Sequence, residues 1–209
     1  MSLIPAFEIG VWNAWILQVI SFLTLSAPNI FMSKEEKERV NRSTESTMLS
    51  KLSKTEKWLA LSTHVVIMPL AFIYSIFLPL KLGTAWLYVG LPIFTLSLVM
   101  SLIATYNFAA TPLGEPVTIG IYRISRHPVY LSGFVMYVGI GIACASWVLL
   151  LCAVLWIVFW QIAVPAEERF LVEQYGDAYR EYIDRTPRWI GIPSRSANQA
   201  KALSKTGLP

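Results

Sequence analysis

Long stretches without a charged side chain dominate this chain. Four such runs cover residues 9–33, 58–80, 82–114 and 128–166. Because about 20 helical residues cross the roughly 30 Å hydrocarbon core of a bilayer, the first three runs predict one transmembrane helix each. The fourth run is long enough for two helices, which we expect to fold as a hairpin that turns at Cys144-Ala145-Ser146. The pattern therefore predicts an all-α integral membrane protein with about five transmembrane helices.

The composition and the distribution of positive charge extend this prediction to a topology. Hydrophobic residues make up 55% of the chain and charged residues 14%, which does not fit a soluble domain. Seven Lys and Arg lie in residues 34–57, two in 114–127 and seven after residue 165, against Lys81 alone on the opposite side. Because positive charges accumulate in cytoplasmic loops, we expect a multi-pass protein with its N-terminus outside and its C-terminus cytoplasmic.

The net charge of +4 is then explained by topology and by contact with membrane lipid headgroups. We therefore expect no nucleic-acid partner. The sequence carries no signal for an oligomeric state.

The chain reads as one membrane domain, residues 1–192, followed by a tail, residues 193–209, with the composition of a disordered segment. Two capping boxes, Ser33-Lys34-Glu35-Glu36 and Ser53-Lys54-Thr55-Glu56, predict a short surface helix and the start of the second transmembrane helix. For His64, inside that helix, we favour a neutral ring bonded to a neighbouring helix over a functional site.

Two features that suggest cofactor chemistry are better explained by helix packing. Cys144 and Cys152 stand eight residues apart in an apolar run, a setting that favours neither a disulfide nor a zinc site. Gly139-Ile140-Gly141 follows no strand and suits close helix packing rather than nucleotide binding. We expect no metal site.

The first cluster of functional groups is Arg126-His127-Pro128-Val129-Tyr130. His127 precedes a proline and is pushed away from helical backbone angles, whereas Pro128 fits the first position of a helix. The helix start, flanked by Arg123, Arg126 and His127, offers free N–H groups and positive charge to an anion. Contact of these basic residues with lipid phosphates explains the same residues equally well.

The second cluster, Glu167-Glu168, follows Pro165, which we expect to end or kink the last transmembrane helix. Adjacent helical residues point about 100° apart, so the two carboxylates cannot face one partner. Glu168 shares a face with Leu171 and Tyr175 and is predicted to point inward. For Glu167, a functional role and a role at the helix dipole stay equally open.

The remaining C-terminal pattern continues this helix and then starts a new one. Tyr175-Gly176-Asp177 predicts a helix end and a new N-cap. Further on, Arg188 lies beside Trp189, a pair that suits the membrane interface and in which the arginine can clamp a carboxylate. The clusters together predict a cytoplasmic pocket for a polar cofactor, bordered by an apolar bundle.

Over residues 112–190, these motifs resemble the C-terminal signature of the isoprenylcysteine carboxyl methyltransferase and phospholipid N-methyltransferase superfamily. The motifs concerned are Gly120-Ile121-Tyr122-Arg123, Ser125-Arg126-His127-Pro128-Val129-Tyr130, Gly133, Glu167-Glu168, Leu171, Tyr175-Gly176, Tyr179, Tyr182 and Pro187-Arg188. The resemblance implies an integral membrane enzyme that uses S-adenosyl-L-methionine to methylate a lipid-like or isoprenoid acceptor at the cytoplasmic membrane face.

The resemblance also implies roles for particular residues. His127, Pro128, Tyr130, Glu167 and Glu168 would bind the cofactor, and Arg188 would orient the substrate or act in catalysis. The electrostatic argument adds Arg126 for the cofactor carboxylate and favours Glu168 for its amine or sulfonium.

The chemical group of the methyl acceptor decides whether the reaction needs a general base. A carboxylate acceptor requires no general base, and Arg188 would hold it. A thiol or amine must lose a proton, for which His127, Glu168 or a tyrosine is a candidate. The competing interpretations are an NADPH-dependent membrane reductase, since membrane sterol reductases share part of the pattern, and a non-catalytic membrane module.

Overall fold

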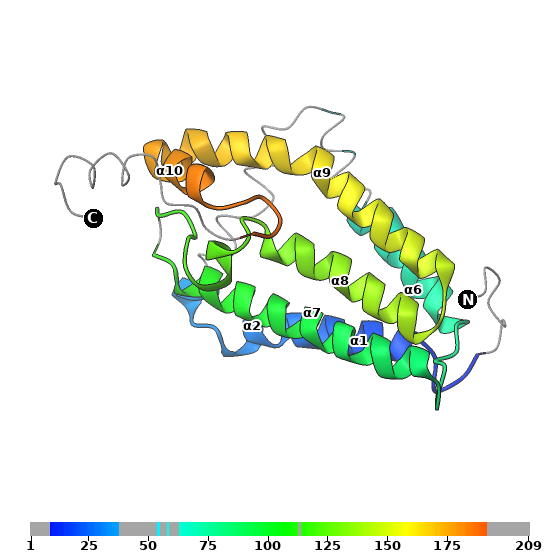
Figure 1. The fold of residues 1–209 in the computed structure, drawn as a ribbon. Helices are drawn as coiled ribbons and strands as arrows, with labels where there is room; N and C mark the ends of the chain where they lie inside the picture. The colour runs from blue at the N-terminus through cyan, green and yellow to red at the C-terminus, as the bar shows by residue number, and fades with distance from the viewer. Residues whose placement is uncertain (1–8, 38–53, 55–57, 59–62, 113, 192–209) are drawn as a thin grey trace, which may run out of the picture.

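The chain folds as a bundle of helices (Figure 1). The computed structural model describes residues 9–37, 54, 58, 63–112 and 114–191, and no strand occurs within these ranges. The all-α prediction is confirmed. In chain order, the elements are α1 (Trp15–Ser26), α2 (Pro28–Phe31), the π-helical turn η1 (Thr63–Ile67), α6 (Met68–Ile76), α7 (Ala85–Ala110), the 3₁₀ turn η2 (Gly120–Arg123), α8 (Pro128–Ala143), α9 (Trp147–Tyr175) and α10 (Asp177–Arg185).

The predicted hairpin is present and turns at the predicted residues. Helix α8 ends at Ala143 and α9 begins at Trp147. Ala145 adopts a left-handed backbone angle of φ 51°, and the Ser146 hydroxyl accepts the Leu149 N–H at 3.5 Å, capping α9. The short polar interruption thus reverses the chain between two apolar helices.

Two helices in the described ranges, α7 and α9, are long and apolar enough to cross a membrane. The other apolar helices, Trp15–Ser26, Val65–Ile76 and Pro128–Ala143, are shorter. The first predicted helix is shorter than expected because it begins only at Trp15 and is interrupted at Pro28, which starts α2. Five transmembrane helices and the proposed orientation stay predictions.

The first capping box has the predicted geometry. The Ser33 N–H donates to Glu36 Oε2 at 2.7 Å, and the Glu36 N–H donates to Ser33 Oγ at 3.2 Å. The second box, Ser53-Lys54-Thr55-Glu56, and the tail 193–209 fall outside the described residues, apart from Lys54. The same holds for the side chain of His64, whose backbone lies in η1.

Helices α7 and α8 form the most extensive helix pair, and glycines let their backbones meet. A Cβ atom on Gly90 would lie 2.3 Å from Ala143 N and 2.6 Å from Gly139 O. A Cβ on Gly139 would lie 2.6 Å from Phe94 N. The packing role predicted for Gly139-Ile140-Gly141 is confirmed, because close approach of two helices requires small residues at the contact.

A second glycine contact places the segment that precedes α8. Gly120 has φ 57°, and a Cβ there would lie 2.0 Å from Asn107 Oδ1. The same Asn107 oxygen accepts the Ile121 N–H at 3.0 Å. Asn107, near the end of α7, therefore holds η2 against the bundle.

Helix α9 extends further than predicted. It runs through Pro165, which has no N–H to donate to the Gln161 carbonyl, and changes direction along its length (Figure 1). It ends at Tyr175, as predicted, where Gly176 has φ 58°. Gly176 is also the N-cap of α10, so Asp177 is its first residue rather than its cap, and it pairs with Arg180 at 2.7 Å.

Gly90→Ala tests the backbone contact between α7 and α8. Because the added methyl group meets the Ala143 and Gly139 backbones, we expect a loss of about 1–3 kcal/mol in the free energy of unfolding. Ala85→Leu adds more volume at an exposed position of the same helix and should change stability by less than about 0.5 kcal/mol. Chemical unfolding in detergent measures both, and equal stability of the two variants would contradict the contact.

Candidate functional site

The segment before α8 is shaped by Ser125 and Pro128. Pro128 is the first residue of α8, as predicted, and His127 precedes it with φ −128° and ψ 57°, outside the helical region. The buried Ser125 hydroxyl accepts the His127 N–H at 3.2 Å and donates to the Arg188 carbonyl at 3.3 Å. One hydroxyl thus fixes the backbone on both sides of the site.

The carboxylate of Glu168 is the centre of the site. Its Oε1 lies 3.2 Å from His127 Nε2 and 3.1 Å from Arg126 Nη1. Arg188 donates from Nε to Oε1 at 3.2 Å and from Nη2 to Oε2 at 2.6 Å. A two-point contact between a guanidinium and a carboxylate fixes the orientation of both groups. The structure therefore brings Arg126, His127 and Arg188 together on one carboxylate.

This cluster is largely buried. The exposed fractions of the side chains are 4% for His127, 8% for Glu168, 10% for Arg126 and 32% for Arg188. The hydrogen bond to Glu168 raises the pKa of the Arg188 guanidinium above its ordinary value. Arg188, the most exposed of the four, stays cationic and links the buried network to the surface.

Glu167 and Glu168 approach the two ring nitrogens of His127, so the prediction that the adjacent carboxylates cannot face one partner is wrong. One imidazole can lie between both carboxylates because its two nitrogens are on different sides of the ring. Glu167 Oε2 is buried, lies 3.7 Å from His127 Nδ1 and makes no hydrogen bond with the described residues. Arg126 Nε and Nη1 are likewise buried without a hydrogen bond there, although Nη1 pairs in charge with Glu168. These atoms leave hydrogen-bonding capacity for a bound polar molecule.

Aromatic rings extend the site toward the interior of the bundle. The Tyr130 ring stacks on His127, with 5.6 Å between ring centroids, and on Trp160, with 3.5 Å between them. The Trp156 indole N–H donates to the Tyr130 carbonyl at 2.9 Å. Sequence reasoning missed Trp160, although it precedes Glu168 by eight residues, a spacing that places both on one face of α9.

Helix α10 returns the chain to the site. The Tyr182 hydroxyl donates to the Tyr122 carbonyl at 2.7 Å, and burial raises the pKa of the Tyr122, Tyr179 and Tyr182 phenols above the ordinary value. The phenols therefore stay protonated, and Tyr182 remains a donor that fastens α10 to η2. Arg123, which was predicted to flank the site, is exposed on η2 and joins no part of the Glu168 network within the described ranges.

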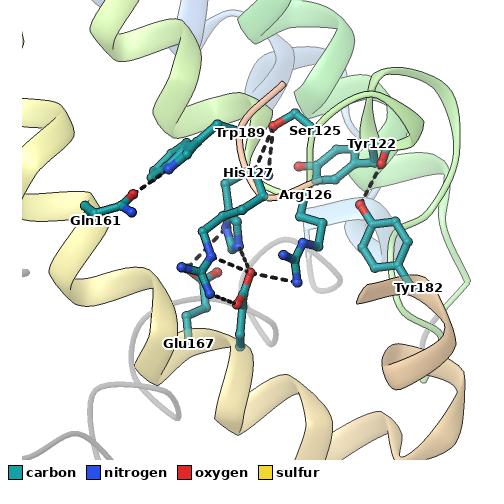
Figure 2. Close-up of polar contacts among 10 residues, drawn as sticks. Tyr122, Ser125, Arg126, His127, Gln161, Glu167, Tyr182 and Trp189 are labelled. Atoms are coloured by element: carbon teal, nitrogen blue, oxygen red, sulfur yellow. Dashed lines mark hydrogen bonds and ion pairs between the residues drawn. The ribbon is translucent and has the colours of Figure 1, made fainter. Parts of the chain in front are cut away.

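The segment 186–191 lies across the site between α10 and the start of α8. The Arg126 N–H donates to the Pro187 carbonyl at 3.1 Å, and the Gly191 N–H donates to the Ile124 carbonyl at 3.2 Å. The Trp189 indole N–H donates to Gln161 Oε1 on α9 (Figure 2). Gln161 was not predicted as a site residue, although it is the single amide side chain in the run 128–166.

Comparison with known proteins gives two matches. Residues 85–178 match the family model described as phospholipid methyltransferase. A 79-residue stretch is 39% identical to a protein-S-isoprenylcysteine O-methyltransferase from Schizosaccharomyces pombe. The resemblance to this superfamily is confirmed. The second match covers 37% of this chain and 32% of the relative, so the chain aligns with about a third of that protein's length.

The phospholipid methyltransferase-like region, residues 85–178, contains most of the site. It extends from α7 to the start of α10 and includes Arg126, His127, Glu167 and Glu168. Arg188 lies beyond it and reaches Glu168 only through the fold. The matched region thus contains the predicted site residues other than Arg188, and the roles of all of them stay predictions.

Glu168→Gln tests the central carboxylate. The variant leaves the buried Arg126 guanidinium without its counter-ion, so we expect the free energy of unfolding to fall by about 3–5 kcal/mol. The matched control is Glu181→Gln on α10, whose carboxylate is half exposed and pairs with Arg185; its loss should be at most about 1 kcal/mol. Chemical unfolding in detergent measures both, and equal losses would show that Glu168 does not stabilise the network.

Proposed function

We propose that this chain is an S-adenosyl-L-methionine-dependent integral membrane methyltransferase acting on a lipid-like or isoprenoid acceptor. The observation that carries the proposal is the convergence of Arg126, His127 and Arg188 on Glu168 at the end of the apolar helix α9. Most of this cluster lies in the region that matches the phospholipid methyltransferase family. The matches to methyltransferases do not favour the reductase or the non-catalytic module.

The polar residues of the site fit the cofactor. Arg126 Nε and Nη1 are buried donors without a hydrogen bond in the described ranges, and a carboxylate is the group that a guanidinium binds best. Glu167 Oε2 is a buried acceptor that likewise makes no hydrogen bond with the described residues, and a carboxylate oxygen suits an amine. We propose that these residues, with His127, Pro128, Tyr130 and Glu168, hold S-adenosyl-L-methionine, which supplies an electrophilic methyl group.

Arg188 and Glu168 are the proposed catalytic residues. Arg188 is the part of the network that reaches the surface, where an acceptor from the lipid would arrive. With a carboxylate acceptor, Arg188 holds the nucleophile by charge and hydrogen bonding. With an amine or thiol, His127 takes up the proton. Burial raises the pKa of the Glu168 carboxyl, but hydrogen bonds from His127 and Arg188 outweigh burial and lower this pKa to about 2, so Glu168 stays anionic and stabilises the protonated ring. Positioning and exclusion of water dominate in either case, because the transfer needs little covalent help from the protein.

We further propose that the protein is multi-pass, with its N-terminus outside and the site at the cytoplasmic face. The excess of Lys and Arg in residues 34–57, in residues 114–127 and after residue 165 supports this orientation. The apolar surfaces of α7 and α9 support insertion in lipid. The acceptor would then approach laterally from the membrane and the cofactor from the cytosol.

Binding of S-adenosylhomocysteine to the purified protein tests the cofactor. We expect saturable binding that Glu167→Gln weakens by about 10-fold or more, since a hydrogen bond to a charged group contributes about 1.5–3 kcal/mol. The amide oxygen that this variant introduces can still accept the hydrogen bond that the Glu167 side chain makes with Tyr130, so the variant should stay folded. Glu181→Gln should bind as the wild type does. Binding of NADPH alone would favour the reductase, and binding of neither would favour the module.

Transfer of a labelled methyl group into a membrane lipid extract, or into a synthetic isoprenylcysteine, tests the reaction. Arg188→Ala should lower kcat/KM for the acceptor by about 10–100-fold, because it removes a charged hydrogen-bonding group. The control is Arg180→Ala, whose guanidinium is exposed and pairs with the exposed Asp177. Unchanged transfer by Arg188→Ala would remove this residue from the proposed reaction, and the labelled product would identify the acceptor class.

A further inference from the structure

Trp189 connects the site to the outer surface of α9. Its indole ring lies 6.3 Å from the His127 ring, measured between centroids, and its N–H donates to the side chain of Gln161. His127 is buried against Glu168, whereas Gln161 is exposed on α9. One side chain therefore forms the partition between the charged cluster and the surface of the helix.

That surface of α9 is apolar. Val158 and Ile162, on either side of Gln161 in sequence, are 47% and 49% exposed, and Val154 is 51% exposed. In a membrane these side chains face lipid, where an amide without a partner is costly because no water can satisfy it. The Trp189 indole N–H donates a hydrogen bond to the Gln161 side-chain oxygen. Breaking this bond would leave that oxygen without a partner in lipid, so the bonded state is favoured there.

The backbone around Trp189 is fixed on one side only. Pro187, Arg188 and Gly191 accept from or donate to residues 124–126. Toward α9, the hydrogen bonds of segment 186–191 in the described ranges are those of Arg188 with Glu168 and of Trp189 with Gln161. The Gln161 contact is thus the lipid-side attachment of the residue that follows Arg188.

We propose that Gln161 and Trp189 form a latch that positions Arg188 and closes the lipid-side entrance through which the acceptor reaches the site. This inference rests on the proposed function and adds two positioning residues on the acceptor side. Within the part of the chain that the structure describes, no hydrogen bond or ion pair joins Gln161 or Trp189 to Arg126 or Glu167, so we expect the latch to act on the acceptor rather than on the cofactor. A lipid-like acceptor must pass the indole before its polar end meets Arg188.

Trp189→Phe and Gln161→Met test the latch, since each removes the hydrogen bond and keeps most of the side-chain volume. A hydrogen bond contributes about 0.5–1.5 kcal/mol, so each variant should lower kcat/KM for the acceptor by about 3–10-fold, because Arg188 loses its positioning contact. The change should lie mainly in KM for the acceptor, with the affinity for S-adenosylhomocysteine within about 2-fold of the wild type. The double variant should be no more affected than either single one, because both lose the same contact.

The matched control is Trp15→Phe, which also loses an indole hydrogen bond, from Trp15 to the Gly10 carbonyl at 3.1 Å, on the distant helix α1. Thermal unfolding of each variant identifies any that fails to fold. If one of the two single variants does, the kinetics of the other single variant test the latch. If the wild type transfers the methyl group, and Trp189→Phe and Gln161→Met have the same kinetics as Trp15→Phe, the latch is overturned and the proposed function is not. Independent, multiplying effects in the double variant would overturn the latch too. Absence of transfer and of S-adenosylhomocysteine binding in the wild type would overturn the proposed function and the latch together.

Discussion

The burial of one carboxylate constrains the arrangement of the C-terminal half of the chain. Glu168 lies near the end of a long apolar helix, where an unpaired charge is costly, and it is paired with Arg126 and Arg188. Arg126 precedes α8, and Arg188 follows α10. The charge can be buried only if both segments return to α9, so the ion pairs tie three separate parts of the chain to one point.

The helices supply the frame in which these pairs can form. Glycines at 90 and 139 bring α7 and α8 into backbone contact, and Asn107 fixes η2 beside the start of α8. Helices α8 and α9 are close at the hairpin turn and separate toward their other ends (Figure 1). The chain after α10 crosses the molecule at the end where they are separated. Charged groups therefore collect where the apolar helices separate, while the hairpin end is packed with apolar residues.

The site also divides by chemistry. Among the described residues, Arg126 Nε and Nη1 and Glu167 Oε2 are buried without a hydrogen bond, whereas Arg188 and Trp189 lie toward the surface of α9. The proposed function uses this division for two reactants, a polar cofactor and a lipid-like acceptor, with Arg188 between them.

The sequence by itself determined the helices and their breaks, because these depend on local properties. The apolar runs predicted the helical regions, Pro128 the start of α8, Cys144-Ala145-Ser146 the hairpin turn and Tyr175-Gly176 the end of α9. The extension of α9 through Pro165 was not determined, since proline ends some helices and only bends others, according to their packing. The inward direction of Glu168 followed from helical spacing and is confirmed by its burial.

Only the tertiary structure decided which residues meet. Arg188 lies 20 residues from Glu168 in sequence and Arg126 lies 42 residues away, and spacing over such loops does not fix a distance. The stacking of Tyr130 on Trp160 and the contact of Trp189 with Gln161 likewise depend on how α9 and the returning segment pack. The sequence thus carried the list of reactive groups in Arg126-His127-Pro128-Val129-Tyr130 and Glu167-Glu168. Helix packing set their geometry, because hydrogen bonds and ion pairs act only over a few ångströms.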